Sequence, residues 1–425
     1  MKKLVVVGII ILLFGMSVPS TGINVEKVST TSFDSKTLYV GGSGQGNYTK
    51  IKDAIDNAND GDTVYVYSNV YYETNIYVNK SISLIGEDCN TTVIDGNNTL
   101  YHVLILEKGN ATINGFTVRN AGYAKDGIVI LSDNNVVIEC KFLYNFYHGV
   151  YLEDGHDNTI SNCDFYDNMW GLEIQGWDFY VLNNEILNCT FGPDNDIDIS
   201  YVKNALITNC TFNKSIIVFN SAIDGTKVKN CVFNNSHYGI GTFSYGYNMN
   251  IENCLFLNCN HDGIYFDDGQ YNLTVRNCTF DNCGANGIGF SYVIGCNISN
   301  CTFINSTYNG LYFLGSAIQC DIFDCRFINN EDGIEFFYGG RQVKVNRCHF
   351  EKNDHGIKID FRNLFNRFNE NNFIDNTEHI CFEGMYVIID FYKNNYWDDW
   401  RGWGPYHVKG FLNWDWHPAK EPYDI

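Results

Sequence analysis

The stretch Arg276-Asn277-Cys278-Thr279-Phe280 contains one of ten Cys–x–Phe pairs in the chain. Successive cysteines of these pairs are 21 to 26 residues apart, and they are Cys140, Cys163, Cys189, Cys210, Cys231, Cys254, Cys278, Cys301, Cys325 and Cys348. A motif that recurs at a nearly constant period in this range indicates a solenoid, in which each period is one structural unit stacked on the previous one.

A second motif follows most of these cysteines after eight or nine residues and consists of Gly and an apolar–any–apolar triplet, as in Gly149 to Leu152 and Gly310 to Phe313. Runs of three to five alternating residues are separated by Asn, Asp and Gly, which is typical of short strands joined by turns. About three such strands per period predict coils that stack as parallel strands about 4.8 Å apart. The expected fold is all-β, a single-stranded parallel β-helix solenoid.

With these repeats the chain resembles the right-handed parallel β-helix superfamily, the pectin-lyase-like fold, over nearly all of its length. Residues 38–87 are similar to the N-terminal coils of that superfamily, where an amphipathic helix plugs the first coil. We expect this helix at Tyr48 to Asn59, with an apolar face of Ile51, Ala54, Ile55 and Ala58. The ending Asn394 to Trp400 (NNYWDDW) resembles the close of the NosD-like, carbohydrate-binding-and-hydrolysis group. The resemblance does not define an activity, because the superfamily includes lyases, hydrolases, esterases, epimerases, adhesins and non-catalytic surface proteins.

The N-terminus has the pattern of a secretory signal: two lysines, an apolar run from Leu4 to Met16, and then small residues. We expect a signal peptide at residues 1–22, a linker at 23–37, an N-terminal cap and first coils at 38–105, β-helix coils at 106–390 and a Trp-rich C-terminal cap at 391–425. No later apolar run reaches the roughly 18 residues that a membrane span needs. The mature protein is therefore expected to be secreted or held at the cell surface, without a transmembrane segment.

The chain is strongly acidic, with 28 basic and 49 acidic side chains and a net charge of −21. Long-range repulsion disfavours nucleic acid and anionic lipid as partners. Neutral glycans or cations suit such a surface better, so a polysaccharide or a cell-surface glycan is the expected partner.

The 16 cysteines could be buried thiols, disulfides or metal ligands. An even number of cysteines in an exported chain favours disulfides, but stacked in-register cysteines point the same way, which suits disulfide geometry poorly. No C-x-x-C occurs, and a line of thiols is not tetrahedral. Seven of the repeat cysteines follow Asn, a residue that can form a ladder at a turn, so we expect buried thiols beside an Asn ladder.

The middle residue of the strand after the Gly should point outward in every coil. We assign this column to Val129, Tyr151, Glu173, Asp198, then after one unassigned coil Thr242, Tyr265, Gly289, Tyr312, Glu335 and Lys358. Glu173 and Asp198 are thus candidate acid–base residues with Lys203 as a base, while Glu173, Asp196 and Asp198 are candidate Ca²⁺ ligands. Such clusters also arise by chance in a chain with this many acids, so the expected cofactor is either none or Ca²⁺.

Aromatic residues form the second candidate surface. Tyr151, Tyr265 and Tyr312 lie in the outward column, with Tyr245 and Tyr292 expected in the turns beyond it. Exposed rings along a rigid face can stack on successive sugars, although cross-strand stacking alone would also explain them.

Five of the seven tryptophans follow residue 396. A solenoid needs a cap over its last coil, so we expect a structural cap there. The alternative is a sugar-stacking platform with a site formed by His407, Asp415 and His417.

Three functions remain after these observations. A secreted or cell-surface β-helix that binds a glycan or is structural agrees with them best. The alternative is a polysaccharide lyase, hydrolase or epimerase, although the Gly-His-Gly and Asp-Pro-His-Glu sets that the resemblance implies for the hydrolases and epimerases are absent. Copper handling, suggested by the NosD resemblance, is disfavoured because the chain has only 5 Met and 10 His without a cluster.

Overall fold

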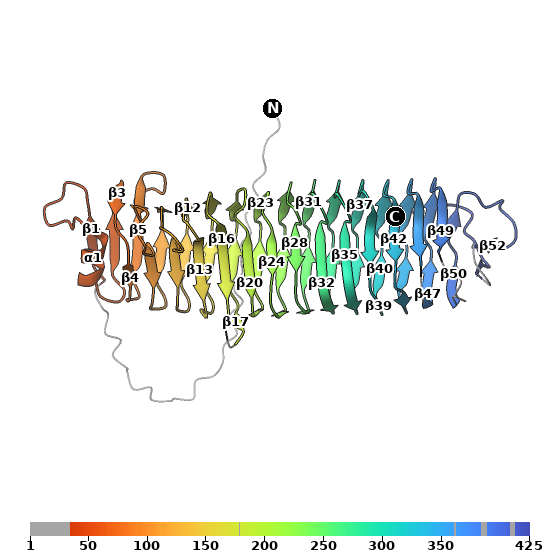
Figure 1. Ribbon diagram of the computed structural model, residues 1–425, viewed down its shortest axis with the longest axis horizontal. Coiled ribbons are helices and arrows are strands. Elements are labelled where there is room, and N and C mark those ends of the chain that lie inside the picture. The colour runs from red at the N-terminus through yellow and green to blue at the C-terminus, as the bar shows by residue number, and fades with distance from the viewer. Residues whose placement is uncertain (1–34, 178, 361–362, 384–388, 409–412) are drawn as a thin grey trace, which may run out of the picture. The chain divides into compact units, whose positions relative to one another are not determined.

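The computed structural model describes residues 35–177, 179–360, 363–383, 389–408 and 413–425 (Figure 1). The expected signal peptide and residues 23–34 of the expected linker lie outside this part of the chain. No helix among the described residues is long and apolar enough to cross a membrane.

Residues 35–425 form a parallel β-helix in which each coil supplies strands to two sheets, as predicted (Figure 1). The first strand series follows the repeat Gly, and we call its outer surface the Gly-led face. It contains β4 (Ile76–Val78), β7 (Leu104–Leu106), β10 (Ile128–Ile130), β13 (His148–Glu153), β16 (Trp170–Gln175), β20 (Ile197–Ser200), β24 (Ile217–Phe219), β28 (Ile240–Thr242), β32 (Ile264–Tyr271), β35 (Ile288–Ile294), β38 (Asn309–Phe313), β42 (Asp332–Phe336), β46 (His355–Ile359) and β49 (Glu378–Phe382).

The second series precedes the repeat cysteines and belongs to the same 38-stranded sheet. It contains β1 (Thr37–Val40), β2 (Thr63–Val66), β5 (Ser83–Gly86), β8 (Thr112–Asn114), β11 (Val136–Ile138), β14 (Thr159–Ser161), β18 (Glu185–Leu187), β22 (Leu206–Thr208), β26 (Lys227–Lys229), β30 (Asn250–Glu252), β33 (Thr274–Arg276), β36 (Asn297–Ser299), β40 (Asp321–Phe323), β44 (Lys344–Asn346), β47 (Leu364–Asn369), β50 (Ile389–Lys393) and β53 (Trp414–Asp415). Short strands between the two series are β17 (Val181–Leu182), β21 (Val202–Lys203), β25 (Ile223–Asp224), β29 (Gly246–Tyr247), β39 (Ala317–Ile318) and β43 (Gly340–Arg341).

The third series carries the repeat Phe and forms the 15-stranded second sheet. It contains β3 (Asn69–Tyr72), β6 (Thr92–Asp95), β9 (Thr117–Arg119), β12 (Lys141–Leu143), β15 (Asp164–Tyr166), β19 (Thr190–Phe191), β23 (Thr211–Asn213), β27 (Val232–Asn234), β31 (Leu255–Leu257), β34 (Thr279–Asp281), β37 (Thr302–Ile304), β41 (Arg326–Ile328), β45 (His349–Glu351), β48 (Asn372–Ile374) and β51 (Tyr396–Trp397). Parallel pairing in one register keeps each residue type in its own column from coil to coil.

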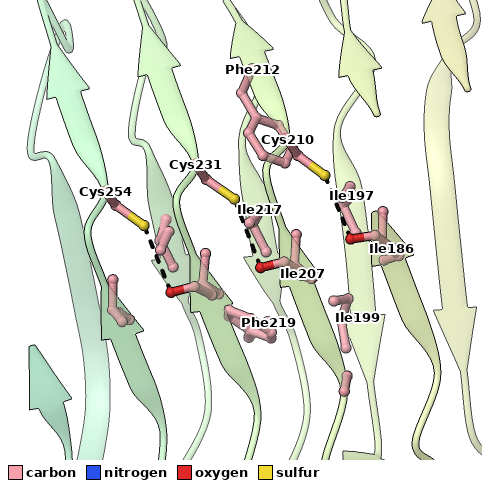
Figure 2. Close-up of a cluster of buried hydrophobic side chains, with 14 of the residues drawn as sticks. Ile186, Ile197, Ile199, Ile207, Cys210, Phe212, Ile217, Phe219, Cys231 and Cys254 are labelled. Atoms are coloured by element: carbon pink, nitrogen blue, oxygen red, sulfur yellow. Dashed lines mark hydrogen bonds between the residues drawn. The ribbon is translucent and has the colours of Figure 1, made fainter. Parts of the chain in front are cut away.

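The repeat Cys and Phe fill the core, as expected. The phenyl rings form one continuous stack, with centroids 4.8 Å apart between Phe280 and Phe303 and 4.9 Å between Phe303 and Phe327. Each repeat thiol is buried and points at a backbone carbonyl one coil earlier, so that Cys210 Sγ lies 3.6 Å from the Ile186 oxygen and Cys231 Sγ 3.8 Å from that of Ile207 (Figure 2). None of these ten cysteines forms a disulfide.

Seven of the ten repeat cysteines follow Asn, and from Asn188 to Asn277 these Asn side chains form the expected ladder. Asn277 Nδ2 donates to Asn253 Oδ1 at 3.0 Å, and Asn253 Nδ2 donates to Asn230 Oδ1 at 3.1 Å. These residues have left-handed backbones, with φ of 54° at Asn277, a conformation that Asn tolerates better than most residues. One residue type therefore makes the turn and joins neighbouring coils.

Caps cover the two ends of the described solenoid. Helix α1 (Ile51–Asn57) buries Ile51, Ala54 and Ile55, which confirms the predicted apolar face within a shorter helix than Tyr48 to Asn59. At the other end, the indole of Trp397 lies between the rings of Phe373 and Tyr406, at centroid distances of 4.5 and 4.4 Å.

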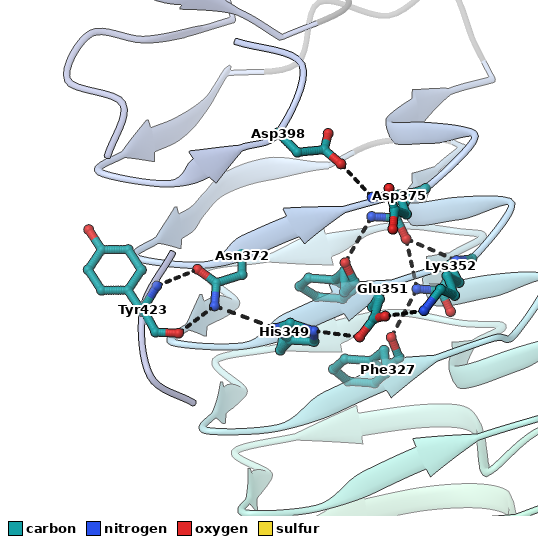
Figure 3. Close-up of polar contacts among 11 residues, drawn as sticks. Phe327, His349, Glu351, Lys352, Asn372, Asp375, Asp398 and Tyr423 are labelled. Atoms are coloured by element: carbon teal, nitrogen blue, oxygen red, sulfur yellow. Dashed lines mark hydrogen bonds and ion pairs between the residues drawn. The ribbon is translucent and has the colours of Figure 1, made fainter. Parts of the chain in front are cut away.

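The last residues return to the solenoid. The backbone N–H of Tyr423 donates to Asn372 Oδ1 and the Asn372 amide donates to the Tyr423 carbonyl, both at 2.8 Å (Figure 3). In the same region the Asp375 N–H donates to Asp398 Oδ2 at 2.6 Å, which ties the cap to the coil beneath it (Figure 3). Strand β52 (Tyr406–His407) pairs antiparallel with β53.

Candidate functional site

The outward column of the Gly-led face differs from the predicted one in the irregular coils. Strand pairing places Val218 after Asp198 and Gly241 before Tyr265, whereas Thr242 pairs with the core residues Phe219 and Phe266. Thr242 was therefore assigned wrongly, because the coil before it is only about 20 residues long and lacks the repeat Gly. The remaining assignments of the column are confirmed.

A buried histidine connects carboxylates from the two coils on either side of its own on this face. His148 begins β13, and its Nδ1 lies 2.9 Å from Asp126 Oδ1 while its Nε2 lies 2.7 Å from Glu173 Oε2. The side chain is only 3% exposed, and Asp126 also has His102 Nδ1 at 3.0 Å from its Oδ2. We call Asp126, His148, Glu173 and Asp198 the His148 cluster.

The electrostatics of the His148 cluster favour a charged imidazole. Burial alone would lower the pKa of His148, but the hydrogen bonds and charges of Asp126 and Glu173 raise that pKa to about 9. Burial also opposes ionisation of Asp126, yet hydrogen bonds from His102 and His148 hold the pKa of that carboxyl below its usual value. At neutral pH His148 is thus an imidazolium, and its two ring nitrogens donate to Asp126 and Glu173.

Glu173 and Asp198 are register partners on β16 and β20, as predicted. Burial and the neighbouring charge of Glu173 raise the pKa of Asp198 to about 6, although its Oδ2 accepts a hydrogen bond from Asn220 at 2.6 Å. A carboxyl group with a raised pKa beside a second carboxyl group is able to take part in acid–base chemistry.

The proposed calcium ligands have separate hydrogen-bond partners. Asp196 Oδ1 accepts from the Ile216 N–H at 2.9 Å, and burial raises the pKa of this carboxyl to about 6. Glu173, Asp196 and Asp198 are not gathered around one point, since the described residues whose ligand atoms lie within 4.8 Å of one another are two other groups near the C-terminal end.

Lys203 is not brought to the cluster. It lies on β21, past the turn that follows β20, and its Nζ is 2.9 Å from Asp224 Oδ2 in the next coil. The sequence distance to Asp198 is short, but the turn directs the lysine to another strand series. In this structure Lys203 is therefore paired with Asp224, and its role as a base stays a prediction.

The tyrosines expected to bind ligand occupy the Gly-led face in pairs with other rings. Tyr151 stacks on His148 at a centroid distance of 5.3 Å, and Tyr265 stacks on Tyr238 at the same distance. Tyr312 lies beside Phe337 at 6.5 Å, and Tyr245 is 53% exposed. Tyr292 is within strand β35 rather than in a turn.

A second Asp–His pair lies nine strands further along the same face. His355 Nδ1 is 2.6 Å from Asp332 Oδ1, and Lys358 Nζ is 3.1 Å from Glu335 Oε1. Burial raises the pKa of Asp332 to about 6 even though His355 opposes this. A cavity of about 280 Å³ opens here, bounded by Asn309, Tyr312, Asp332, Glu335 and Lys358 among others.

The aromatic C-terminal residues act mainly as a cap. Asp415 is fully buried and accepts hydrogen bonds from the backbone of Asn395 and the indole of Trp397. His417 contributes its backbone N–H to the same carboxylate. His407 packs against the ring of Trp414 at 4.4 Å. Asp415 is thus committed to the packing of the last coil.

Sequence reasoning missed His148, Asp126, His355 and Asp332 as a set. All four directly precede the Gly of their coil, and in this column Asp is followed by His in the next coil twice, which is a signal present in the sequence. The side chain of the residue before the Gly also lies on the outer side of the coil. The Gly-led face therefore carries two columns of outward side chains, this one and the column of middle strand residues.

Solved structures of phage and bacterial proteins are similar to this chain. The N-terminal fragment of bacteriophage phi29 gene product 12 matches at 14% identity with a TM-score of 0.54, covering 79% of this chain and 67% of that one. Tailspike protein 3 of bacteriophage CBA120 matches at 14% identity and a TM-score of 0.47 over 84% of this chain and 61% of its own. The A-module of an Azotobacter vinelandii mannuronan C-5 epimerase matches at 12% identity with a TM-score of 0.47. The match covers 82% of this chain and 95% of that one.

No curated protein sequence matches the chain. The family described as "Right handed beta helix region" matches residues 40–193, 101–247, 171–322 and 268–395, which together span nearly the whole described solenoid. The chain therefore belongs to the right-handed β-helix family.

Proposed function

We propose that this protein is an exported β-helix that binds a glycan across the Gly-led face at the His148 cluster. The observation that carries the proposal is the hydrogen-bonded line from Asp126 through His148 to Glu173, beside the half-buried ring of Tyr151. Sugars are bound by hydrogen bonds to their hydroxyl groups and by stacking on aromatic faces. Both kinds of contact are available at this place.

The surroundings of the cluster extend this surface. Trp177 is 60% exposed, and its indole N–H donates to Glu153 Oε1 at 2.8 Å, which fixes the orientation of the ring. A fixed aromatic ring loses little entropy when a ligand stacks on it. Successive coils about 4.8 Å apart present these groups in a line, an arrangement that suits an extended polymer.

Charge narrows the ligand class. The net charge of −21 and the carboxylates of the cluster repel a polyanion, so a neutral or amine-bearing glycan is the proposed ligand and a polyuronate is not. Export is part of the proposal and is supported by the signal-like pattern of residues 1–22.

Glycan-array binding of the protein tests the proposal. We expect binding to neutral or amino-sugar polymers, weakened at least tenfold by Tyr151→Ala and by Trp177→Ala. Tyr166→Ala is the matched control, because Tyr166 is an outward ring on β15, on the other sheet. Absence of glycan binding, or equal loss in the control, would contradict the proposal.

Acid–base catalysis on the bound glycan is a second candidate, favoured by the register pair Glu173 and Asp198 and by the pKa of about 6 at Asp198. In that case Asp198 donates a proton and Glu173 acts as the carboxylate. Reducing-sugar assays on the bound glycan should then show turnover that Asp198→Asn abolishes while glycan binding persists. Binding without turnover in the unmodified protein excludes this candidate.

A further inference from the structure

Three different metal-binding side chains converge on the Gly-led face near its C-terminal end. His355 begins β46, while Glu378 and Cys381 lie on the next strand, β49. One ligand atom from each of the three lies within 4.8 Å of those of the other two. The strand register explains this, because His355 pairs with Glu378 and Lys358 pairs with Cys381.

The imidazole of His355 is oriented by a buried acid. Asp332 Oδ1 lies 2.6 Å from His355 Nδ1, and the side chain of Asp332 is only 3% exposed. This contact leaves Nε2 as the ring nitrogen for any further ligand. A histidine whose second nitrogen donates to a carboxylate is the arrangement that commonly supports a metal-bound histidine.

Cys381 differs from the repeat cysteines in its position. The repeat thiols lie inside the coil, in the column beside the stacked Phe rings. Cys381 follows Glu335 and Lys358 in the outward column of the Gly-led face. The core therefore does not require a cysteine at this place, and the thiol belongs to the surface that carries His355.

We propose that His355, Glu378 and Cys381 bind a zinc-type divalent cation, with Asp332 holding the histidine. One thiolate, one imidazole and one carboxylate match the ligand preferences of zinc, and three protein ligands leave a fourth position open. Two of these ligands are anionic when bound, which balances the charge of the ion.

The surrounding charge also favours a cation. Glu335 and Asp332 contact Lys358 at 3.1 and 3.8 Å, and Glu383 lies 3.9 Å from the same ammonium group. Lys358 thus contacts three acids, Asp332, Glu335 and Glu383, and Glu378 is a further acid of this region. Asp332 and Lys358 also bound a cavity of about 280 Å³.

The same residues could instead form a Cys–His–Asp nucleophile. In that arrangement the carboxylate of Glu378, within 4.8 Å of the other two ligand atoms, would repel a thiolate that no cation neutralises. With a bound cation the same carboxylate is a ligand. The nearby group His379, Asp398 and Asp399 offers no thiolate, and Asp398 already accepts from the Asp375 N–H.

Cobalt substitution of the chelator-treated full-length protein tests the proposal. We expect tight Zn²⁺ binding of one ion per chain in competition with a chromophoric chelator, and Co²⁺ should give a thiolate-to-metal absorption band in the near ultraviolet. Cys381→Ser should remove that band and weaken Zn²⁺ binding more than tenfold. Asp332→Asn should weaken binding about ten- to a hundredfold without removing the band.

Matched variants keep the result interpretable. Cys89→Ser removes a part-exposed cysteine near the other end of the solenoid and should leave the band unchanged. Circular dichroism melts of each variant should be recorded to establish that it is folded. Failure of the unmodified protein to bind Zn²⁺, a Co²⁺ complex without the thiolate band, or loss of binding in Asp399→Asn but not in Cys381→Ser would each overturn the proposal.

Discussion

His148 and Glu173 lie on neighbouring coils, with Nε2 of the imidazole 2.7 Å from Oε2 of the carboxylate. Asp126 contacts the opposite nitrogen, so the ring is charged at neutral pH and its pKa is raised to about 9. A histidine whose pKa is higher in the folded than in the unfolded chain stabilises the fold fully below the unfolded value of about 6.5. That stabilisation is lost as the pH rises through about 9.

The pH dependence of stability should therefore depend on His148. We expect His148→Gln to lower the free energy of unfolding by about 3 kcal/mol near pH 6 and by clearly less near pH 10, from the difference between the two pKa values. Denaturant titrations of both proteins at the two pH values provide the measurement. In Glu173→Gln the pKa of His148 falls, so the pH dependence should shrink. Equal destabilisation by His148→Gln at both pH values would show that the imidazole is not charged.

The Asn ladder should contribute to stability in two separable ways. Asn253 has a φ of 54° and takes part in two side-chain amide hydrogen bonds along the ladder. Asn253→Gly keeps the left-handed turn and loses only the hydrogen bonds, at about 1 kcal/mol. Asn253→Ala adds the left-handed strain of about 1 kcal/mol or more. Thermal melts of the two variants should rank alanine below glycine, and the reverse order would show that the turn does not depend on backbone freedom.

The thiols should be unreactive in the folded protein. Cys89 is half-buried and the other 15 cysteines are buried. We expect Ellman's reagent to modify very few thiols in the native protein and all 16 after denaturation without reductant. A lower count in the denatured protein, falling in pairs, would reveal disulfides instead.

The C-terminal cap should stabilise the last coils locally. Trp397 is 1% exposed and stacks between Phe373 and Tyr406. Trp397→Ala leaves a large cavity and should cost about 3 to 5 kcal/mol. Because each coil contacts mainly its neighbours, hydrogen exchange should accelerate in β48 and β50 and change little in β10 and β13. Uniform acceleration along the chain would argue against such local coupling.

Much of the fold could be predicted because the repeat places one residue type in one environment. Cys278, Phe280 and Asn277 each occupy a column that the period alone defines, and the apolar face of α1 follows from Ile51, Ala54 and Ile55. The outward residue of the coil containing Val218 could not be predicted in this way. That coil is only about 20 residues long and lacks the repeat Gly, which is the marker that sets the register.

The candidate sites were less predictable because they depend on pairs of columns. His148 meets Glu173 only because the position before the Gly in one coil lies beside the middle position of the next. Lys203 shows the opposite case, since a turn separates it from a carboxylate that is near in sequence. Cys381 has the same residue type as the core cysteines but occupies the outward column, and only the strand register shows this.

The stack of rings from Phe142 to Trp397 also constrains how the protein can change in length. An insertion of a few residues within a coil can be accommodated at a turn, but it adds no ring, thiol or ladder amide. Duplication of one whole period adds one ring, one thiol and one ladder amide. The added coil then makes the same contacts with the coil before it and the coil after it. The chain can therefore lengthen or shorten in steps of one coil while both caps, and the distance between a site and its nearer cap, are preserved.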